Sequence, residues 1–250
     1  MNCKRIVSII CFLASQAVLW AQYEVCQVDA VRYELTSDWD ATPDEGAVQI
    51  LTPYQLAVDS IMSPVLGESD VQLWPGRPES PLSNFVADVL LDASARVGKK
   101  ADIGLCNIGG LRSSLPKGAI TYGDVLAACP FDSKMVILTL KGDVLIRLME
   151  QIASVGGEGV SHGVQIGITS DHRYINAMFQ GQQIDPHAIY VIATLDFLAE
   201  GNDGLTALRD HILKRSTPFV VRELVAEAIM RAQAEGRKVT AKTEGRVAIQ

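Results

Sequence analysis

Residues 79–112, ESPLSNFVADVLLDASARVGKKADIGLCNIGGLR, place a helix pattern, a strand pattern and a glycine-containing loop in direct succession. Apolar residues recur at three- and four-residue intervals over 79–98, which predicts an amphipathic helix with one face in the core. Gly98 is suited to end that helix. Residues 101–106 predict a buried strand, and the loop after it combines Asn, Gly-Gly and Arg. Two adjacent glycines allow a tight turn or the close approach of a ligand.

Similar patterns extend from this stretch in both directions. Thr121 is expected to cap one helix, Pro218 to begin the last helix, and residues 181–185 to interrupt two strands as a hairpin would. The predicted helices are residues 52–65, 79–98, 121–129, 141–154 and 221–236, and the predicted strands are 71–74, 101–106, 134–140, 163–169, 174–180, 190–195 and 245–250. Helices and strands are mixed without strict alternation, so we predict an α+β, or mixed α/β, fold with helices layered on mixed sheets.

The N-terminus has the pattern of a secretory signal peptide. Lys4 and Arg5 precede a short apolar run, and small residues follow it. We predict a signal peptide over 1–21, with cleavage after Ala21, and export to the periplasm or the extracellular space. The apolar run is too short for a comfortable membrane span. Residues 22–50 are polar and acidic, and are expected to form an irregular lead-in or an isolated strand around 23–28 and 31–36. Residues 51–250 are expected to form one domain.

Charge and cysteine content exclude two classes of protein. The formal net charge of -7 becomes -9 without residues 1–21, and an acidic surface argues against nucleic-acid binding. The cysteines left after cleavage, Cys26, Cys106 and Cys129, do not make a dense disulfide framework. Cys106 and Cys129 each precede a loop, so a disulfide between them is one interpretation. Two buried free thiols are the favoured one.

The sequence offers no motif for familiar catalytic centres. It contains neither G-x-S-x-G nor G-x-x-x-x-G-K-[ST]. The four histidines, His162, His172, His187 and His211, are scattered, and the one Asp-x-His run, residues 185–187, has no second ligand cluster near it in sequence. We therefore assign no metal ligand and no catalytic residue to this chain.

Three loops remain as candidate binding segments, namely residues 106–112, 129–133 and 196–205. They offer planar, aromatic and charged side chains, which are Asn107, Arg112, Phe131, Phe197 and Asp203. Such a set suits a planar heterocycle that carries hydroxyls and a negative charge, because aromatic faces stack on the ring, a carboxylate accepts from hydroxyls and a guanidinium binds an oxyanion. The alternative is that both phenylalanines are core residues and that Asp203 and the glycines only form turns.

Four motifs in this order resemble the C-terminal, substrate-specificity domain of the bacterial and animal 5′-nucleotidase family. Residues 80–93 resemble the family's Leu-Gly-Asn-Leu-x-x-Asp-Ala helix, and 101–131 its Asn-x-Gly-Gly-Ile-Arg segment with the following Pro-Phe. Residues 140–150 resemble its Leu-x-Gly-x-x-Leu helix start, and 196–205 its Phe/Tyr-x-x-x-Gly-Gly-Asp-Gly loop. The resemblance covers most of the chain and implies the fold of that domain.

The resemblance also implies roles for individual residues. Phe131 and Phe197 correspond to the two aromatics that sandwich the base, and Asp203 to the ribose-binding aspartate. Asn107 and Arg112 correspond to substrate contacts, and Gly109 and Gly110 allow the close turn between them. Arg77 lies near the position of a further family arginine but precedes Pro78, and is left out of the predicted set. Asn202 replaces a family glycine, which an asparagine can tolerate if the backbone is left-handed there, and Leu205 replaces a common aromatic.

The family's N-terminal metallophosphoesterase domain, with its Asp-x-His and Gly-Asn-His-Asp/Glu motifs for two metals, has no counterpart in these 250 residues. The first hypothesis is therefore that the chain is the nucleotide-recognising half of a split 5′-nucleotidase, a hydrolase component acting in nucleotide catabolism. A separately encoded metallophosphatase would hold the divalent metals. The alternatives are a stand-alone extracytoplasmic nucleoside- or nucleotide-binding protein without catalysis, and a degenerate domain kept for protein contacts.

Overall fold

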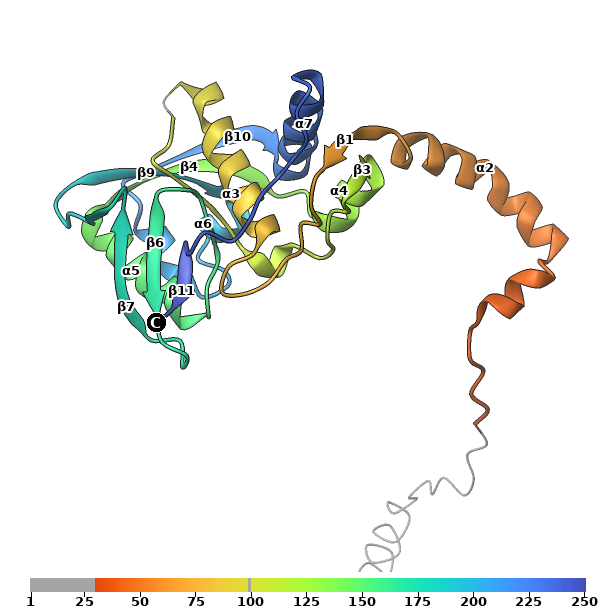
Figure 1. Ribbon diagram of the computed structural model, residues 1–250, viewed down its shortest axis with the longest axis horizontal. Coiled ribbons are helices and arrows are strands. Elements are labelled where there is room, and N and C mark those ends of the chain that lie inside the picture. The colour runs from red at the N-terminus through yellow and green to blue at the C-terminus, as the bar shows by residue number, and fades with distance from the viewer. Residues whose placement is uncertain (1–29, 99) are drawn as a thin grey trace, which may run out of the picture. The chain divides into compact units, whose positions relative to one another are not determined.

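The computed structural model describes residues 30–98 and 100–250, which divide between Leu51 and Thr52 into two units (Figure 1). The predicted signal peptide and the possible strand at 23–28 lie outside the described residues. Residues 31–36 form no strand, and a 3-10 helix, η1 (Ser37–Ala41), follows them. Helix α2 (Glu45–Met62) begins inside the predicted lead-in. It ends three residues before the predicted end because Ser63 precedes Pro64, which disfavours helical backbone.

The second unit contains the helices and strands of a mixed α/β fold, as predicted. The helices are α3 (Pro81–Ala93), α4 (Tyr122–Ala128), α5 (Gly142–Ser154), α6 (Asp196–Ala199) and α7 (Val221–Ala234), with 3-10 helices η2 (Ser94–Val97), η3 (Ile108–Gly110) and η4 (Thr206–Asp210). The strands are β1 (Val65–Ser69), β2 (Ile103–Cys106), β3 (Gly118–Thr121), β4 (Lys134–Lys141), β5 (Gly159–Val160), β6 (Val164–Ile168), β7 (Tyr174–Phe179), β8 (Gln182–Gln183), β9 (Ile189–Leu195), β10 (Leu213–Val220) and β11 (Val247–Ile249).

Two larger sheets organise this unit. The first has the strand order β10-β4-β9-β2-β5, in which only the central β9/β2 pair is parallel. The second has the order β11-β6-β7-β8, and β1 and β3 form a separate antiparallel pair. Helix α5 packs against strands of both larger sheets, whereas α3 packs on β2, β5 and α7 (Figure 1). The loops at the ends of β2 and β9 therefore leave neighbouring strands of one sheet.

The α3–β2 unit that decides the fold is built as its sequence predicts. The Ser80 hydroxyl accepts a hydrogen bond from the Ser83 amide at 3.2 Å, and Pro81 occupies the first turn. At Gly104, in the middle of β2, a Cβ atom would lie 2.0 Å from the carbonyl oxygen of Ala87 on α3. Only glycine permits that approach, so the strand lies directly against the helix backbone. The predicted cap of α4 by Thr121 is also confirmed.

Two sequence predictions were wrong, and the predicted interruption at residues 181–185 contains strand β8, which pairs with β7. Residues 71–74 form no strand, because Leu73 makes a single bridge to Leu115 before Pro75 ends the pairing. Pro218 does not begin α7 but lies within β10, at the shift of register between Ser216 and Val220. An edge strand tolerates proline, since its outer side needs no ladder hydrogen bond. The hairpin between β7 and β8 turns at residues 180–181, both of which have positive φ.

Candidate functional site

A cavity of about 250 Å³ lies where the loops after β2, α4 and β9 meet the start of α7. All seven residues predicted from the sequence line it: Asn107, Gly109, Gly110, Arg112, Phe131, Phe197 and Asp203. Apolar side chains of α3, β9 and α7 complete the wall, together with Leu111. The structure thus brings together residues that are up to 96 positions apart in the sequence.

The loop after β2 presents a buried amide to the cavity. The Asn107 side chain is 7% exposed, and its Nδ2 donates a hydrogen bond to Asp203 Oδ2 at 2.6 Å. A Cβ atom on Gly110 would lie 2.8 Å from Asn107 Oδ1, so a side chain at 110 would displace the amide. Gly110 is therefore required by the close approach of Asn107 rather than by a left-handed backbone.

The two phenylalanines are exposed aromatics and not core residues. Phe131 is 49% exposed and Phe197 is 42% exposed, which contradicts the alternative that they pack in the core. The Arg112 guanidinium lies over the Phe131 ring, 5.5 Å from its centroid, in a cation–π contact. Aromatic faces at this exposure are available for stacking on a flat ligand. A cationic group stands beside one of them.

The glycine loop carries Asp203 with an unusual backbone. Asp203 has a φ of +53° between Gly201 and Gly204, which also have positive φ. The left-handed non-glycine residue of this loop is Asp203, since φ is not positive at Asn202. Asn202 Nδ2 donates a hydrogen bond to the Phe197 carbonyl at 2.8 Å and so closes the loop. Leu205 is fully buried and lies in the core.

A buried carboxylate supports the Asn107 loop from behind. Glu158 accepts a hydrogen bond from the Ile108 amide and pairs with Arg77, and its side chain is fully buried. Burial raises the pKa of the Glu158 carboxyl to about 7, although the Ile108 amide and Arg77 act in the opposite direction. Asp203 adds to the increase through charge repulsion. Arg77 therefore belongs to this support and is not among the residues that line the cavity.

Two thiols form part of the cavity wall. Cys106 and Cys129 are both buried and free, so the favoured interpretation of free thiols is the one that the structure shows. Burial raises the pKa of Cys106 well above its ordinary value and that of Cys129 to about 12. Both thiols stay protonated at neutral pH and act as small apolar groups rather than nucleophiles.

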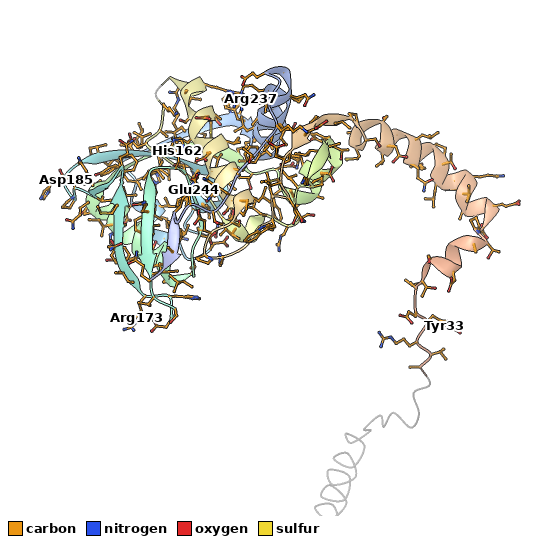
Figure 2. All side chains as sticks on the ribbon, viewed as in Figure 1. Tyr33, His162, Arg173, Asp185, Arg237 and Glu244 are labelled. Atoms are coloured by element: carbon orange, nitrogen blue, oxygen red, sulfur yellow. The ribbon has the colours of Figure 1, made fainter. Side chains whose placement is uncertain are left out.

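None of the four histidines lines this cavity. His162 and Glu244, which are labelled in Figure 2, line a second cavity of about 220 Å³, whereas Asp185 lies at the edge of the view, away from them. Across residues 30–98 and 100–250, no three His, Cys, Asp or Glu side chains are grouped as a metal site requires. Our assignment of no metal ligand remains a prediction.

Three contributors to the site were missed in the sequence. Arg222 and Ser133 line the cavity, and Glu158 supports it. Arg222 stands at the start of an ordinary amphipathic helix, and Glu158 lies in a short glycine-rich run without hydrophobic periodicity. Neither of these two positions carries a local signal, because their roles come from tertiary contacts alone. To identify Arg222, the sequence would have had to predict that the loop after α4 lies against the start of α7.

Comparison with known proteins relates this chain to one protein family. The model of the family "5′-nucleotidase, C-terminal domain" matches residues 65–210. The Trifunctional nucleotide phosphoesterase protein YfkN of Bacillus subtilis is 27% identical over 94% of this chain and 17% of its own length. Protein UshA of Yersinia enterocolitica is 26% identical over 74% of this chain and 34% of its own.

A solved structure extends the similarity to three dimensions. The 5′-nucleotidase precursor from Thermus thermophilus superposes with a TM-score of 0.70 and 27% identity, covering 84% of this chain and 44% of that one. The chain thus spans less than half the length of each of these relatives. Among the helices of the described residues, none has the length and apolar character to cross a membrane.

Proposed function

This chain belongs to the family of 5′-nucleotidase C-terminal domains, and on that premise we propose that its cavity binds the nucleoside part of a nucleotide. The observation that carries the proposal is the convergence of two exposed aromatics, a carboxylate, an amide and a guanidinium on one cavity. A cavity of this kind, apolar with a few placed polar groups, is typical of small-molecule sites.

Each side chain has a chemical role in this proposal. Phe131 and Phe197 stack on the two faces of the base, and Asp203 accepts hydrogen bonds from the ribose hydroxyls. Asn107 holds Asp203 in place through the 2.6 Å hydrogen bond. Arg112 supplies a planar cation at the Phe131 side, where it binds an oxyanion of the nucleotide.

We further propose that hydrolysis of the phosphate ester needs a separate metallophosphatase chain. That partner would hold the divalent metals, which activate water for attack on the phosphate. The support is that the family model matched here is the C-terminal one and that these 250 residues do not include the paired metal-binding motifs. The signal-peptide pattern of residues 1–21 supports encounter of the two chains after export.

The test uses AMP and a purified metallophosphatase-domain protein from the same cell. We expect AMP hydrolysis to be faster with this chain present than with the partner alone, and the increase to be lost with Phe131→Ala. No increase would contradict the split-enzyme proposal. Adenosine binding in that case would favour the stand-alone binding protein, whose supporting observation is a complete cavity within one chain. Absence of both would leave the nucleoside proposal without support.

A further inference from the structure

The segment that carries Phe131 is held at both of its ends by the start of α7. The Arg222 guanidinium donates to Asp132 Oδ1 at 2.7 Å and to the Pro130 carbonyl at 3.4 Å. The amide of Val221 donates to the Ser133 carbonyl at 2.9 Å. Contacts from two consecutive residues of one helix thus bracket the phenylalanine.

The Arg222 side chain is mostly buried and has several polar partners, unlike that of a typical surface arginine. Its side chain is 13% exposed, and its Nε lies 3.4 Å from Glu223 Oε1, an oxygen that also accepts from the Tyr122 hydroxyl at 2.6 Å. Tyr122 is in α4, so this chain of contacts joins α7 to the helix that leads into the Phe131 segment. A guanidinium has the planar fork of donors that such multiple contacts require, whereas an ammonium does not.

Phe131 is only partly held by packing. The residue is 49% exposed, and the Arg112 guanidinium makes a cation–π contact with its ring. Stacking depends on the ring being held at a defined distance and tilt, so a loose segment would lose binding energy to ordering. The hydrogen bonds of Pro130, Asp132 and Ser133 to α7 limit the movement of the segment on either side of Phe131.

We propose that Arg222 is a positioning residue that fixes Phe131 for stacking on the base. This inference rests on the proposed nucleoside function. The competing interpretation is that Arg222 binds the phosphate directly, because Arg222 also lines the cavity. The two roles predict different dependences on the ligand and on Phe131.

The main experiment measures adenosine and AMP affinity of the full chain by calorimetry. We expect Arg222→Met to weaken adenosine binding by roughly 3- to 10-fold and AMP by the same factor. In a Phe131→Ala background, Arg222→Met should cause no further loss. Arg222→Lys should not restore affinity, because the single nitrogen of an ammonium lacks the planar fork whose two nitrogens separately reach Asp132 and the Pro130 carbonyl. Arg147→Met, which removes an exposed ion pair with Asp210, is the matched control and should bind as the wild type does.

A second measurement follows the ring without any ligand. In protein labelled with 4-fluorophenylalanine, the ¹⁹F resonance assigned through Phe131→Leu should shift or broaden in Arg222→Met, while the resonances of Phe85 and Phe179 stay in place. Asp132→Asn should cause a smaller change of the same kind, and serves if Arg222→Met does not fold.

Three results would overturn the inference. They are an unchanged Phe131 resonance, a loss of AMP affinity well above that of adenosine, and an Arg222→Met loss that persists without Phe131. If the wild type binds no adenosine, the proposed function fails, whereas the ¹⁹F measurement still decides whether Arg222 orders Phe131.

Discussion

Two polar motifs of this domain are put to opposite uses. In the loop after β2, Asn107 and Arg112 line a cavity, where their polar groups can contact a ligand. In α3, Asp88 instead binds the C-terminal segment, because both of its oxygens accept from Arg246 at 2.8 Å. Nearby, Glu79 accepts from three successive backbone amides of residues 244–246. Motif residues of one family therefore divide into those that line the cavity and those that bind the C-terminal segment.

The strongest test of this division is Asp88→Ala. The Arg246 side chain is 7% exposed, so its charge would be left buried with Glu244 as the remaining acidic partner. Removing one member of a buried ion pair costs about 3–5 kcal/mol. We expect a loss of stability near the lower end of that range, measured by urea unfolding. Asp92→Ala, which breaks an exposed pair with Lys100, is the control and should change stability by less than about 1 kcal/mol.

A pH series on Glu158→Gln tests a residue between these two groups, because Glu158 holds the Asn107 loop without lining the cavity. With a folded pKa near 7, against an ordinary 4.5, the folded chain binds more protons than the unfolded chain between these pH values. Ionisation of Glu158 therefore lowers wild-type stability as pH rises from about 4.5 to 7. The stability of Glu158→Gln relative to wild type should rise over that interval, by about 1–3 kcal/mol, and level off above it. A difference that does not change with pH would contradict the raised pKa.

Alanine substitution of Phe131 or Phe197 should separate binding from stability. Stacking on an aromatic contributes about 1–3 kcal/mol per base, so adenosine affinity should fall by that amount for either variant. Both rings are about half exposed, and the unfolding free energy should change by less than about 1 kcal/mol. Calorimetry and urea unfolding on the same preparations provide the comparison. Loss of stability without loss of affinity would reassign these rings to packing.

The smallest effect is expected for Asn202→Gly. This change restores the family's glycine and removes the 2.8 Å hydrogen bond to the Phe197 carbonyl. An exposed hydrogen bond contributes about 0.5–1 kcal/mol, so the unfolding free energy should fall by no more than that amount, and the less ordered loop should bind adenosine about two- to fivefold more weakly. Tighter binding would show that Asn202 strains the loop instead of closing it.

The sequence predicted the site better than it predicted its support. Hydrophobic periodicity was enough for α3, α5 and β4, because their buried faces repeat regularly. It failed for β10, an edge strand with a single buried residue and an internal proline. The seven cavity residues came from the composition of three loops and from motif resemblance, which give side chains but not distances. Glu158 and Arg222 act through partners 50 and 90 positions away in the sequence, and no local pattern reports such contacts.

The Asn107–Asp203 hydrogen bond has a consequence for how the protein can be assayed. Its two ends are separated by 96 residues, so the cavity forms only when distant parts of the chain have come together in tertiary structure. Only molecules with the complete cavity would then bind adenosine. Adenosine titration would therefore measure the active fraction of a preparation, and spectroscopy of its helices alone would overestimate that fraction.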